Sequence, residues 1–462
     1  MRSRVSWQTK AALIAGVAGV VTVLGFSSER ARALTEIDQA GGGRWNVAQP
    51  LPEAEGELCE WPSAGNLRQV AALRQSPGGS GGAAANESGG RAPARVIKDP
   101  YPSFSAVAVD TVRNEVVLAD ESTFEVLVYD RLANTPNAVT KPKRVIGGIR
   151  TEIEYPAAVY VDPANADIYL SVNETHDALM IWSATSSGNV PPDRELFTPR
   201  GSFGLAVDET AQEMYLVGQH ESWLTVWKKT ARTDVDSPIR LLQGDHTKLA
   251  DPHGLALDTT NRVMFVSNYG GTHTTVGGGK PAPSRGGGRS TVRNRKNWPA
   301  GQTVPGSGYI LPPSITIYSM DAQGDTAPLR TIQGPKTGLN WPTLLSFDPK
   351  RGGELFVANN TGNEILVFSA SADGDVAPVR ILKGRKTLIK NPTGVFVDTK
   401  NDELWVASLG SHVATVYPST ASGDTAPLRV IRSAPPNQPR VLLGNPGAVA
   451  YDSKRDQLLV PN

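Results

Sequence analysis

The chain has 462 residues, of which 39% are hydrophobic and 20% are charged, and its formal net charge at pH 7 is +1. A composition with 46 glycines and 35 prolines is typical of an ordinary globular all-β chain, in which many short strands are joined by turns. Because the acidic and basic residues nearly balance, the composition excludes a global electrostatic argument for binding nucleic acid or a membrane surface.

Residues 1–33 have the pattern of an export signal. Basic residues (Arg2, Arg4 and Lys10) precede an apolar stretch, and Ala31-Arg32-Ala33 fits a small-x-small cleavage site. The apolar stretch of about sixteen residues is shorter than the roughly twenty that a membrane-spanning helix needs. We expect cleaved export to the periplasm, the cell surface or the extracellular space. The alternative is an uncleaved signal anchor, which would be the only contact with a membrane.

Residues 34–66 form an N-terminal extension without a clear period, and the only cysteine of the chain, Cys59, lies within it. An exported chain with one cysteine has no internal disulfide. Cys59 is therefore either a free or buried thiol or a covalent link to a second chain.

The stretch 391–431 contains one complete copy of a repeated unit of four short strands. Alternating apolar and polar residues, bounded by turn residues, indicate strands at 394–397, 403–407 and 413–417. A fourth run starts at Pro427, and proline belongs at a strand start or at a sheet edge because it cannot donate to a ladder. Four-stranded sheets of this kind become stable when they pack around an axis as propeller blades.

Two signatures of this unit each occur seven times. The first is the aspartate that closes strand one: Asp110, Asp162, Asp208, Asp258, Asp348, Asp398 and Asp452. The second is the arginine of a Pro-x-Arg motif that opens strand four: Arg95, Arg144, Arg194, Arg240, Arg330, Arg380 and Arg429. We interpret both as scaffold, since aspartate caps a tight turn and the arginine head can pair with nearby acids. Likewise, we expect three tryptophans to pack between blades: Trp182, Trp227 and Trp405.

The order of the two signatures predicts how the ring closes. The first Pro-x-Arg precedes the first aspartate, so the chain begins and ends in mid-blade. Residues 445–462 supply strands one and two of a seventh blade, and residues 67–97 supply strands three and four. We therefore predict an all-β, seven-bladed β-propeller over residues 67–462, closed by this two-plus-two clasp. A six-bladed ring is the alternative, because Ala71 stands where other blades have an aromatic residue.

The segments NPTGVFVD and ELFVANNTGNEILVF and the GDxAPxR turns at 324–330, 374–380 and 423–429 resemble the NHL/YVTN class of β-propeller repeat proteins. This class includes lactonase-like and gluconolactonase-like members, and the resemblance covers roughly residues 67–462. It implies the fold without implying one activity, because propellers host unrelated functions.

A basic, glycine-rich insertion at 271–313 interrupts the fourth blade. It contains no acidic residue, and its candidate partner-binding residues are Lys280, Arg285, Arg289, Arg293, Arg295, Lys296 and Trp298. Such a loop buries too little apolar surface to order itself, so it is either a solvated disordered loop or a docking arm for an anionic partner. The tryptophan favours contact, because aromatic side chains contribute strongly at interfaces.

The loops into strand one and between strands two and three share the face around the mouth of the central channel, where propellers usually bind ligands. Candidate ligand-binding residues on this face are Asp120, Asn173, His220, His253, Asn268, Asn359, Asn360 and His412. An oxygen-rich rim of this kind can hold Ca²⁺, although Asn and Asp are also common turn residues for local reasons.

The sequence predicts no catalytic residue. The resemblance implies rim histidines for a zinc lyase, and only His253 stands at a strand-one rim position, whereas three protein ligands are usual. It also implies acid and amide ligands for gluconolactonase-like enzymes; Asp120, Asn268 and Asn359 could imitate them, but the strand-one rim lacks an acid. We therefore expect an exported binding or scaffold protein without a cofactor. Its expected partner is an envelope or extracellular protein or an anionic polymer rather than nucleic acid. A Ca-type metal-dependent lactonase or hydrolase using the channel face is the alternative.

Overall fold

The structure, a computed structural model of the chain, describes residues 94–100, 103–173, 176–219, 221–233, 235–272, 310–431, 449–452 and 454–460. All of the described residues belong to one compact unit within residues 78–462. The predicted export signal (1–33) and the N-terminal extension (34–66) lie outside the described residues.

Six sheets, each an antiparallel meander of four strands, form the blades of a propeller. Blades one and two comprise β1 (Phe104–Asp110), β2 (Glu115–Asp120), β3 (Glu125–Asp130), β4 (Arg144–Gly147), β5 (Pro156–Val161), β6 (Ile168–Val172), β7 (Ala178–Trp182) and β8 (Arg194–Phe197). Blades three and four comprise β9 (Ser202–Asp208), β10 (Glu213–Gly218), β11 (Trp223–Lys228), β12 (Arg240–Leu242), β13 (Pro252–Asp258), β14 (Val263–Asn268), β17 (Ser314–Ser319) and β18 (Arg330–Gln333). Blades five and six comprise β19 (Pro342–Asp348), β20 (Glu354–Asn359), β21 (Glu364–Ser369), β22 (Arg380–Leu382), β23 (Pro392–Asp398), β24 (Glu403–Ser408), β25 (Val413–Pro418) and β26 (Arg429–Ile431).

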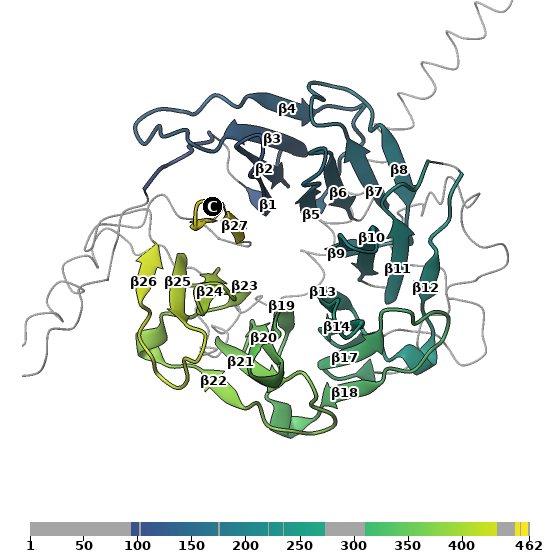
Figure 1. The fold of residues 1–462 in the computed structure, drawn as a ribbon, viewed down its shortest axis with the longest axis vertical. Coiled ribbons are helices and arrows are strands. Elements are labelled where there is room, and N and C mark those ends of the chain that lie inside the picture. Colours follow the sequence, from purple (N-terminus) through teal and green to yellow (C-terminus); the bar gives the residue numbers. More distant parts are fainter. Residues whose placement is uncertain are drawn as a thin grey trace, which may run out of the picture. The chain divides into compact units, whose positions relative to one another are not determined.

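Strand one of each blade lies innermost, and β1, β5, β9, β13, β19 and β23 follow one another around the axis (Figure 1). The all-β propeller prediction is confirmed, and the blade count matches the six-bladed alternative. Two further strands, β27 (Ala450–Asp452) and β28 (Gln457–Leu459), pair with each other at the position predicted for the start of a seventh blade. Of the predicted strands three and four at 67–97, the structure describes only 94–97, so the seven-bladed closure stays a prediction.

The β27–β28 hairpin contacts blades one and six. Leu459 packs on the apolar face of blade one that points away from blade two. The ring of Tyr451 lies 5.6 Å from that of Phe396 in blade six. Arg131, at the end of β3, forms a fully buried ion pair with Asp452, with 2.8 Å between Nη1 and Oδ2. The C-terminal hairpin is therefore an integral part of the closure between the last blade and the first.

One apolar cluster fills each of the five interfaces between consecutive blades. Trp182 lies in the cluster between blades one and two, and Trp227 in the cluster between blades two and three, as predicted. Trp405 is also buried, and the guanidinium carbon of Arg429 lies 5.0 Å from its ring centroid. The core of the propeller is thus distributed between its sheets, which is how a blade buries both of its faces.

The repeated aspartates and arginines have the structural roles that the sequence predicts. Asp110 Oδ1 accepts the N–H groups of Val112 and Arg113, both at 2.8 Å, which caps the turn after strand one. Arg144, at the start of strand four, donates to both carboxylate oxygens of Glu115 at 2.9 and 2.7 Å. The same cap and the same ion pair recur in other blades, so both signatures stabilise the sheet itself.

Turns before strand four, with Gly-Asp at three positions and Gly-Asn at Gly188, cover the outer strand of the preceding blade. Gly423 bridges to Leu382 of β22, and the next residue, Asp424, accepts the N–H of Lys386 at 2.7 Å. Equivalent bridges join Ile146 to Gly188, Leu242 to Gly324 and Ile332 to Gly374. An uncovered outer strand would expose unpaired N–H and C=O groups, so these turns protect the edges of the sheets.

The insertion in blade four leaves the sheet through a two-stranded ribbon, β15 (Gly271–Thr272) and β16 (Ile310–Leu311). Thr272 lies directly opposite Ile310 in this ribbon. The described structure stops at Thr272 and resumes at Ile310, so the predicted basic residues of the insertion lie outside it.

Candidate ligand-binding face

A repeated backbone hydrogen bond joins the two loop series that were predicted to share one face. The residue after strand two donates its N–H to the carbonyl of the residue before strand one. The pairs are Glu121 with Ser103, Asn173 with Tyr155, Gln219 with Gly201, Tyr269 with Asp251, Asn360 with Trp341 and Leu409 with Asn391, at 2.8 to 3.1 Å. We call these twelve residues the rim.

The rim positions before strand one have a left-handed backbone in five of the six blades. Their φ angles are 44° at Tyr155, 87° at Gly201, 54° at Asp251, 56° at Trp341 and 44° at Asn391. Glycine and asparagine adopt this conformation readily, whereas bulky aromatic residues do so at a cost. Tyr155 and Trp341 are nevertheless present, and their exposed fractions are 49% and 52%.

Three of the predicted ligand-binding residues cap local backbone. Asp120 Oδ1 accepts the N–H groups of Ser122 and Thr123 at 2.8 Å. Asn268 Oδ1 accepts the N–H of Ala250 at 3.0 Å, and Asn359 Oδ1 accepts that of Asn340 at 2.7 Å. A Ca²⁺ ion that used these oxygens would compete with those hydrogen bonds, so this donor set fits the ion poorly.

Asn173 and His253 are brought together through Gln219. The side-chain amide of Asn173 donates to Gln219 Oε1 at 3.3 Å, and the amide nitrogen of Gln219 donates to His253 Nε2. Because an amide nitrogen only donates, Nε2 of His253 accepts, and Nδ1 carries the proton donated to the Asp251 carbonyl at 3.0 Å. At the other end, Asn173 Oδ1 is buried and has no hydrogen-bond partner in the described part of the chain.

His253 also belongs to a row of contacting rings that ends at the exposed Trp341. The His253 ring stacks on Tyr269, with centroids 3.4 Å apart and ring planes 8° apart, and Phe203 contacts its other side with centroids 4.7 Å apart. Tyr269 in turn contacts Trp341 at 5.2 Å. Burial raises the pKa of the Tyr269 hydroxyl. The row connects blades three, four and five across the rim.

The remaining predicted residues are not part of this row. Asn360 donates its backbone N–H to Trp341 and its side-chain amide to the Pro392 carbonyl at 3.3 Å. His412 lies in the turn between β24 and β25, where its φ is 53°. His220 lies outside the described residues, as do the predicted residues of the insertion.

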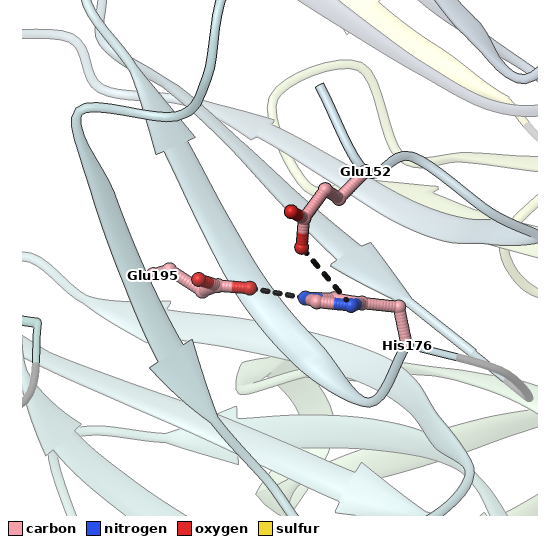
Figure 2. Close-up of side chains that lie close together, drawn as sticks. All are labelled: Glu152, His176 and Glu195. Atoms are coloured by element: carbon pink, nitrogen blue, oxygen red, sulfur yellow. Dashed lines mark hydrogen bonds and ion pairs between the residues drawn. The ribbon is translucent and has the colours of Figure 1, made fainter. Parts of the chain in front are cut away.

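A second cluster on this side of the molecule joins Glu152, His176 and Glu195 (Figure 2). Glu195 accepts from His176 Nε2, and Glu152 Oε2 lies 3.4 Å from His176 Nδ1. Burial alone would lower the pKa of His176, but the hydrogen bond to Glu195 and the charges of Glu195, Glu152 and Glu154 raise it above its ordinary value. The two carboxylates therefore favour a cation at this ring.

Glu195 and the turn that carries His176 both depart from the repeat. Glu195 stands where the other blades have Val145, Leu241, Thr331, Ile381 and Val430. The turn that carries His176 has five residues between the paired Val172 and Ala178, whereas the corresponding turn of blade five has four. Two separate departures from the repeat thus meet at one point.

The sequence prediction missed Gln219 as a connecting residue, and it missed Tyr155, Tyr269 and Trp341 altogether. A signal for two of them was present, because Tyr155 and Trp341 each precede the proline that opens strand one, as Asn391 does in the cleanest repeat. Contacts between blades, such as Tyr269 with Trp341, leave no such pattern along the chain.

Comparison of the sequence with protein-family models and with curated proteins finds no match. No helix in the described part of the chain is long and apolar enough to cross a membrane. The propeller fold is compatible with an interaction role but does not imply one activity, so the function must be argued from the rim itself.

Proposed function

We propose that this protein is an exported binding or scaffold protein that contacts its partner through the rim. The proposal of export depends on the N-terminal pattern of residues 1–33. The proposed NHL-type class depends on the repeated sequence segments. The observation that carries the binding function is the presence of half-exposed aromatic residues, Tyr155 and Trp341, at left-handed positions.

A left-handed backbone costs an ordinary residue about 1–2 kcal/mol relative to a right-handed one. The repeat tolerates the alternatives, because Gly201 and Asn391 occupy the same position in other blades. Bulky residues kept in such a conformation are a reason to infer function. Tryptophan and tyrosine are also the residues that contribute most to binding energy at interfaces.

The ring row and the amide relay give this surface a defined shape. His253, which Phe203 contacts edge-on, stacks on Tyr269, and Tyr269 in turn contacts Trp341. At the other end of the relay, the buried Asn173 Oδ1 is an acceptor that no described residue satisfies. The basic insertion carries the positive charges of Lys280, Arg285 and the other Lys and Arg residues named above. These charges favour an anionic partner, such as an acidic protein or polysaccharide.

The test replaces both aromatic residues by the residue that the repeat itself uses, in the double variant Tyr155→Asn/Trp341→Asn. The wild-type chain is used to capture and identify a partner from the envelope fraction of its host, and the affinity of that partner is then measured by calorimetry. We expect the double variant to lose about 2 kcal/mol or more of binding free energy without loss of thermal stability. The control is Val379→Asn, which changes a residue that is 57% exposed outside the rim. Equal affinity of the double variant would contradict the proposal.

The second candidate function is a metal-dependent hydrolase or lactonase, and the cluster of Glu152, His176 and Glu195 favours it. Three protein ligands are the usual number in a catalytic zinc site. Each nitrogen of His176 faces one carboxylate. A metal ion would take the place of the proton on one of these nitrogens, and both carboxylates would have to move to that ion. Stoichiometric metal in the purified chain, lost together with lactone hydrolysis in His176→Ala, would favour this function. Metal-free chain that hydrolyses no lactone would exclude it.

A further inference from the structure

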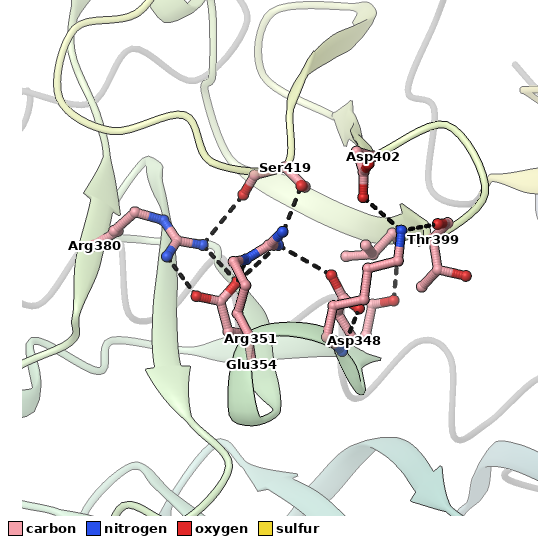
Figure 3. Close-up of polar contacts among 10 residues, drawn as sticks. Asp348, Arg351, Glu354, Arg380, Thr399, Asp402 and Ser419 are labelled. Carbon is pink, nitrogen blue, oxygen red and sulfur yellow. Dashed lines mark hydrogen bonds and ion pairs between the residues drawn. The ribbon is translucent and has the colours of Figure 1, made fainter.

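The arginine of the Pro-x-Arg motif pairs with a glutamate at the start of strand two in four of the six blades. Figure 3 shows this pair in blade five, where Arg380 donates to both oxygens of Glu354 at 2.5 and 2.8 Å. The other pairs are Arg144 with Glu115, Arg240 with Glu213 and Arg429 with Glu403. The glutamate always lies opposite the capping aspartate of strand one.

Blade four has the arginine but not the glutamate. Val263 occupies the position opposite Asp258. Arg330 donates one hydrogen bond, from Nη2 to the Ala370 carbonyl at 2.8 Å, and forms no ion pair with any described residue.

Blade two has the shorter Asp167 at this position, with its Oδ2 4.0 Å from Arg194 Nη2, and there the arginine also has other partners. Arg194 donates to the Tyr169 hydroxyl at 3.0 Å and to the carbonyls of Lys229 and Ala231 at 2.6 and 3.0 Å. Among the arginines at this position in the six blades, Arg330 therefore has the largest unused hydrogen-bonding capacity.

A cavity of about 440 Å³ opens beside Arg330, between blades four and five. Val263, Phe265 and Phe347 form its apolar wall, and the two phenylalanine rings stack with centroids 5.3 Å apart. Gly352 and Gly353 line the cavity without side chains of their own. The space holds a ligand at the lower end of the usual size range for small-molecule sites.

Asp258 also lines the cavity, and blade six shows that an aspartate in this position is compatible with a second carboxylate. The Asp258 carboxylate accepts the backbone N–H groups of Thr260 and Asn261. The side-chain amide of Asn261 also donates to it, at 2.8 Å. In blade six, Asp398 has the same cap, with Asn401 at 2.7 Å. There, the Glu403 carboxylate beside the capped aspartate already accepts hydrogen bonds from the guanidinium of Arg429.

We propose that this cavity binds a small monocarboxylate with an apolar body. The ligand carboxylate pairs with Arg330 in the way that Glu403 pairs with Arg429, and the apolar body packs against Phe265 and Phe347. Planar guanidinium groups favour carboxylates because two parallel N–H donors match the two oxygens. The site is separate from the rim, because its lining includes Asp258, Pro349 and Gly352 from the turns after strand one.

The test measures benzoate binding to the full chain by isothermal titration calorimetry. We expect benzoate to bind saturably. The neutral analogue benzamide and the smaller acetate should bind at least about tenfold more weakly, a difference of about 1.4 kcal/mol in binding free energy. The decisive variant is Val263→Glu, which restores the glutamate of the other blades and fills the site without removing Arg330. We expect it to fold with an unchanged or higher Tm and to lose benzoate binding by at least about tenfold.

Arg330→Gln removes the cation and is expected to lose benzoate binding to the same extent. As a matched control, Arg429→Gln removes an arginine that already has its glutamate, and benzoate binding should not change. Failure of millimolar benzoate to bind wild-type chain, equal binding by Val263→Glu, or equal binding of benzamide would each overturn the proposal.

Discussion

Replacement of Arg131 by methionine should release the C-terminal hairpin from the propeller. Arg131 and Asp452 are both fully buried, so the substitution removes the buried cation that pairs with Asp452 in the closure between blades six and one. Burial lowers the pKa of Arg131, and the charge of Asp452 opposes that effect. Breaking a buried pair from one side costs about 3–5 kcal/mol.

The structure places this variant near the lower end of that range. Asp452 keeps the backbone N–H groups of Lys454 and Arg455 at 3.0 and 3.1 Å, and the Arg455 guanidinium remains at 3.3 Å. We therefore expect a loss of about 3 kcal/mol, expressed as opening of β27 and β28 roughly a hundredfold more often. Arg131 also donates to Gln457 at 2.7 Å, so its replacement removes a second contact with the same hairpin.

Native-state hydrogen exchange measures this opening directly, because it reports free energies for individual segments. The control is Arg113→Met, since Arg113 also pairs with a capping aspartate, at 3.6 Å, but its side chain is 41% exposed. That substitution should change stability by less than about 1 kcal/mol. Unchanged exchange of residues 450–459 in Arg131→Met, or equal effects of the two substitutions, would refute the reasoning.

Three further predictions concern the raised pKa of His176, a glycine in an inter-blade turn and the basic insertion. The raised pKa of His176 contributes stability that is complete below its unfolded pKa of about 6.5 and is lost as the pH rises through the folded pKa. Over that pH window, Tm should therefore fall in the wild-type chain but not in the variant His176→Gln. Gly384→Ala should cost more than about 1 kcal/mol in chemical unfolding, because φ is 140° and a Cβ would collide with Asp424, whereas Gly271→Ala should be neutral. Replacing residues 273–309 by Asn-Gly should close the β15–β16 ribbon as a tight hairpin and leave Tm unchanged. This deletion should also reduce the salt-dependent binding of the chain to immobilised dextran sulfate. Unchanged binding would contradict a docking role for the insertion.

The blades were predictable because their determinants are local. A capping aspartate and a strand-opening proline act within one sheet, so each copy of the repeat can be recognised from the sequence. The ion pair between Arg144 and Glu115 follows from the same regular spacing. The number of blades was harder to predict, since strands three and four of the closing sheet belong to 67–97, where the repeat is weakest.

The rim was less predictable because its contacts join different blades. His253 was recognisable as a departure from the repeat, but its stacking on Tyr269 depends on how blades three to five are placed around the axis. Asp120, Asn268 and Asn359 were chosen for their oxygens, and the structure uses those oxygens to cap backbone. The missing glutamate at Val263 was visible in the sequence, but its meaning required the cavity beside Arg330.

The turns that bridge neighbouring blades determine when each outer strand becomes covered during synthesis of the chain. Because the outer strand of a blade is covered by a turn of the blade that follows it, the strand remains bare until the ribosome has delivered that later segment. A chain stopped after Leu382 would end with β22 uncovered and able to pair with another unfinished chain. At four of the five junctions between the described blades, the later blade thus covers the outer strand of the earlier one.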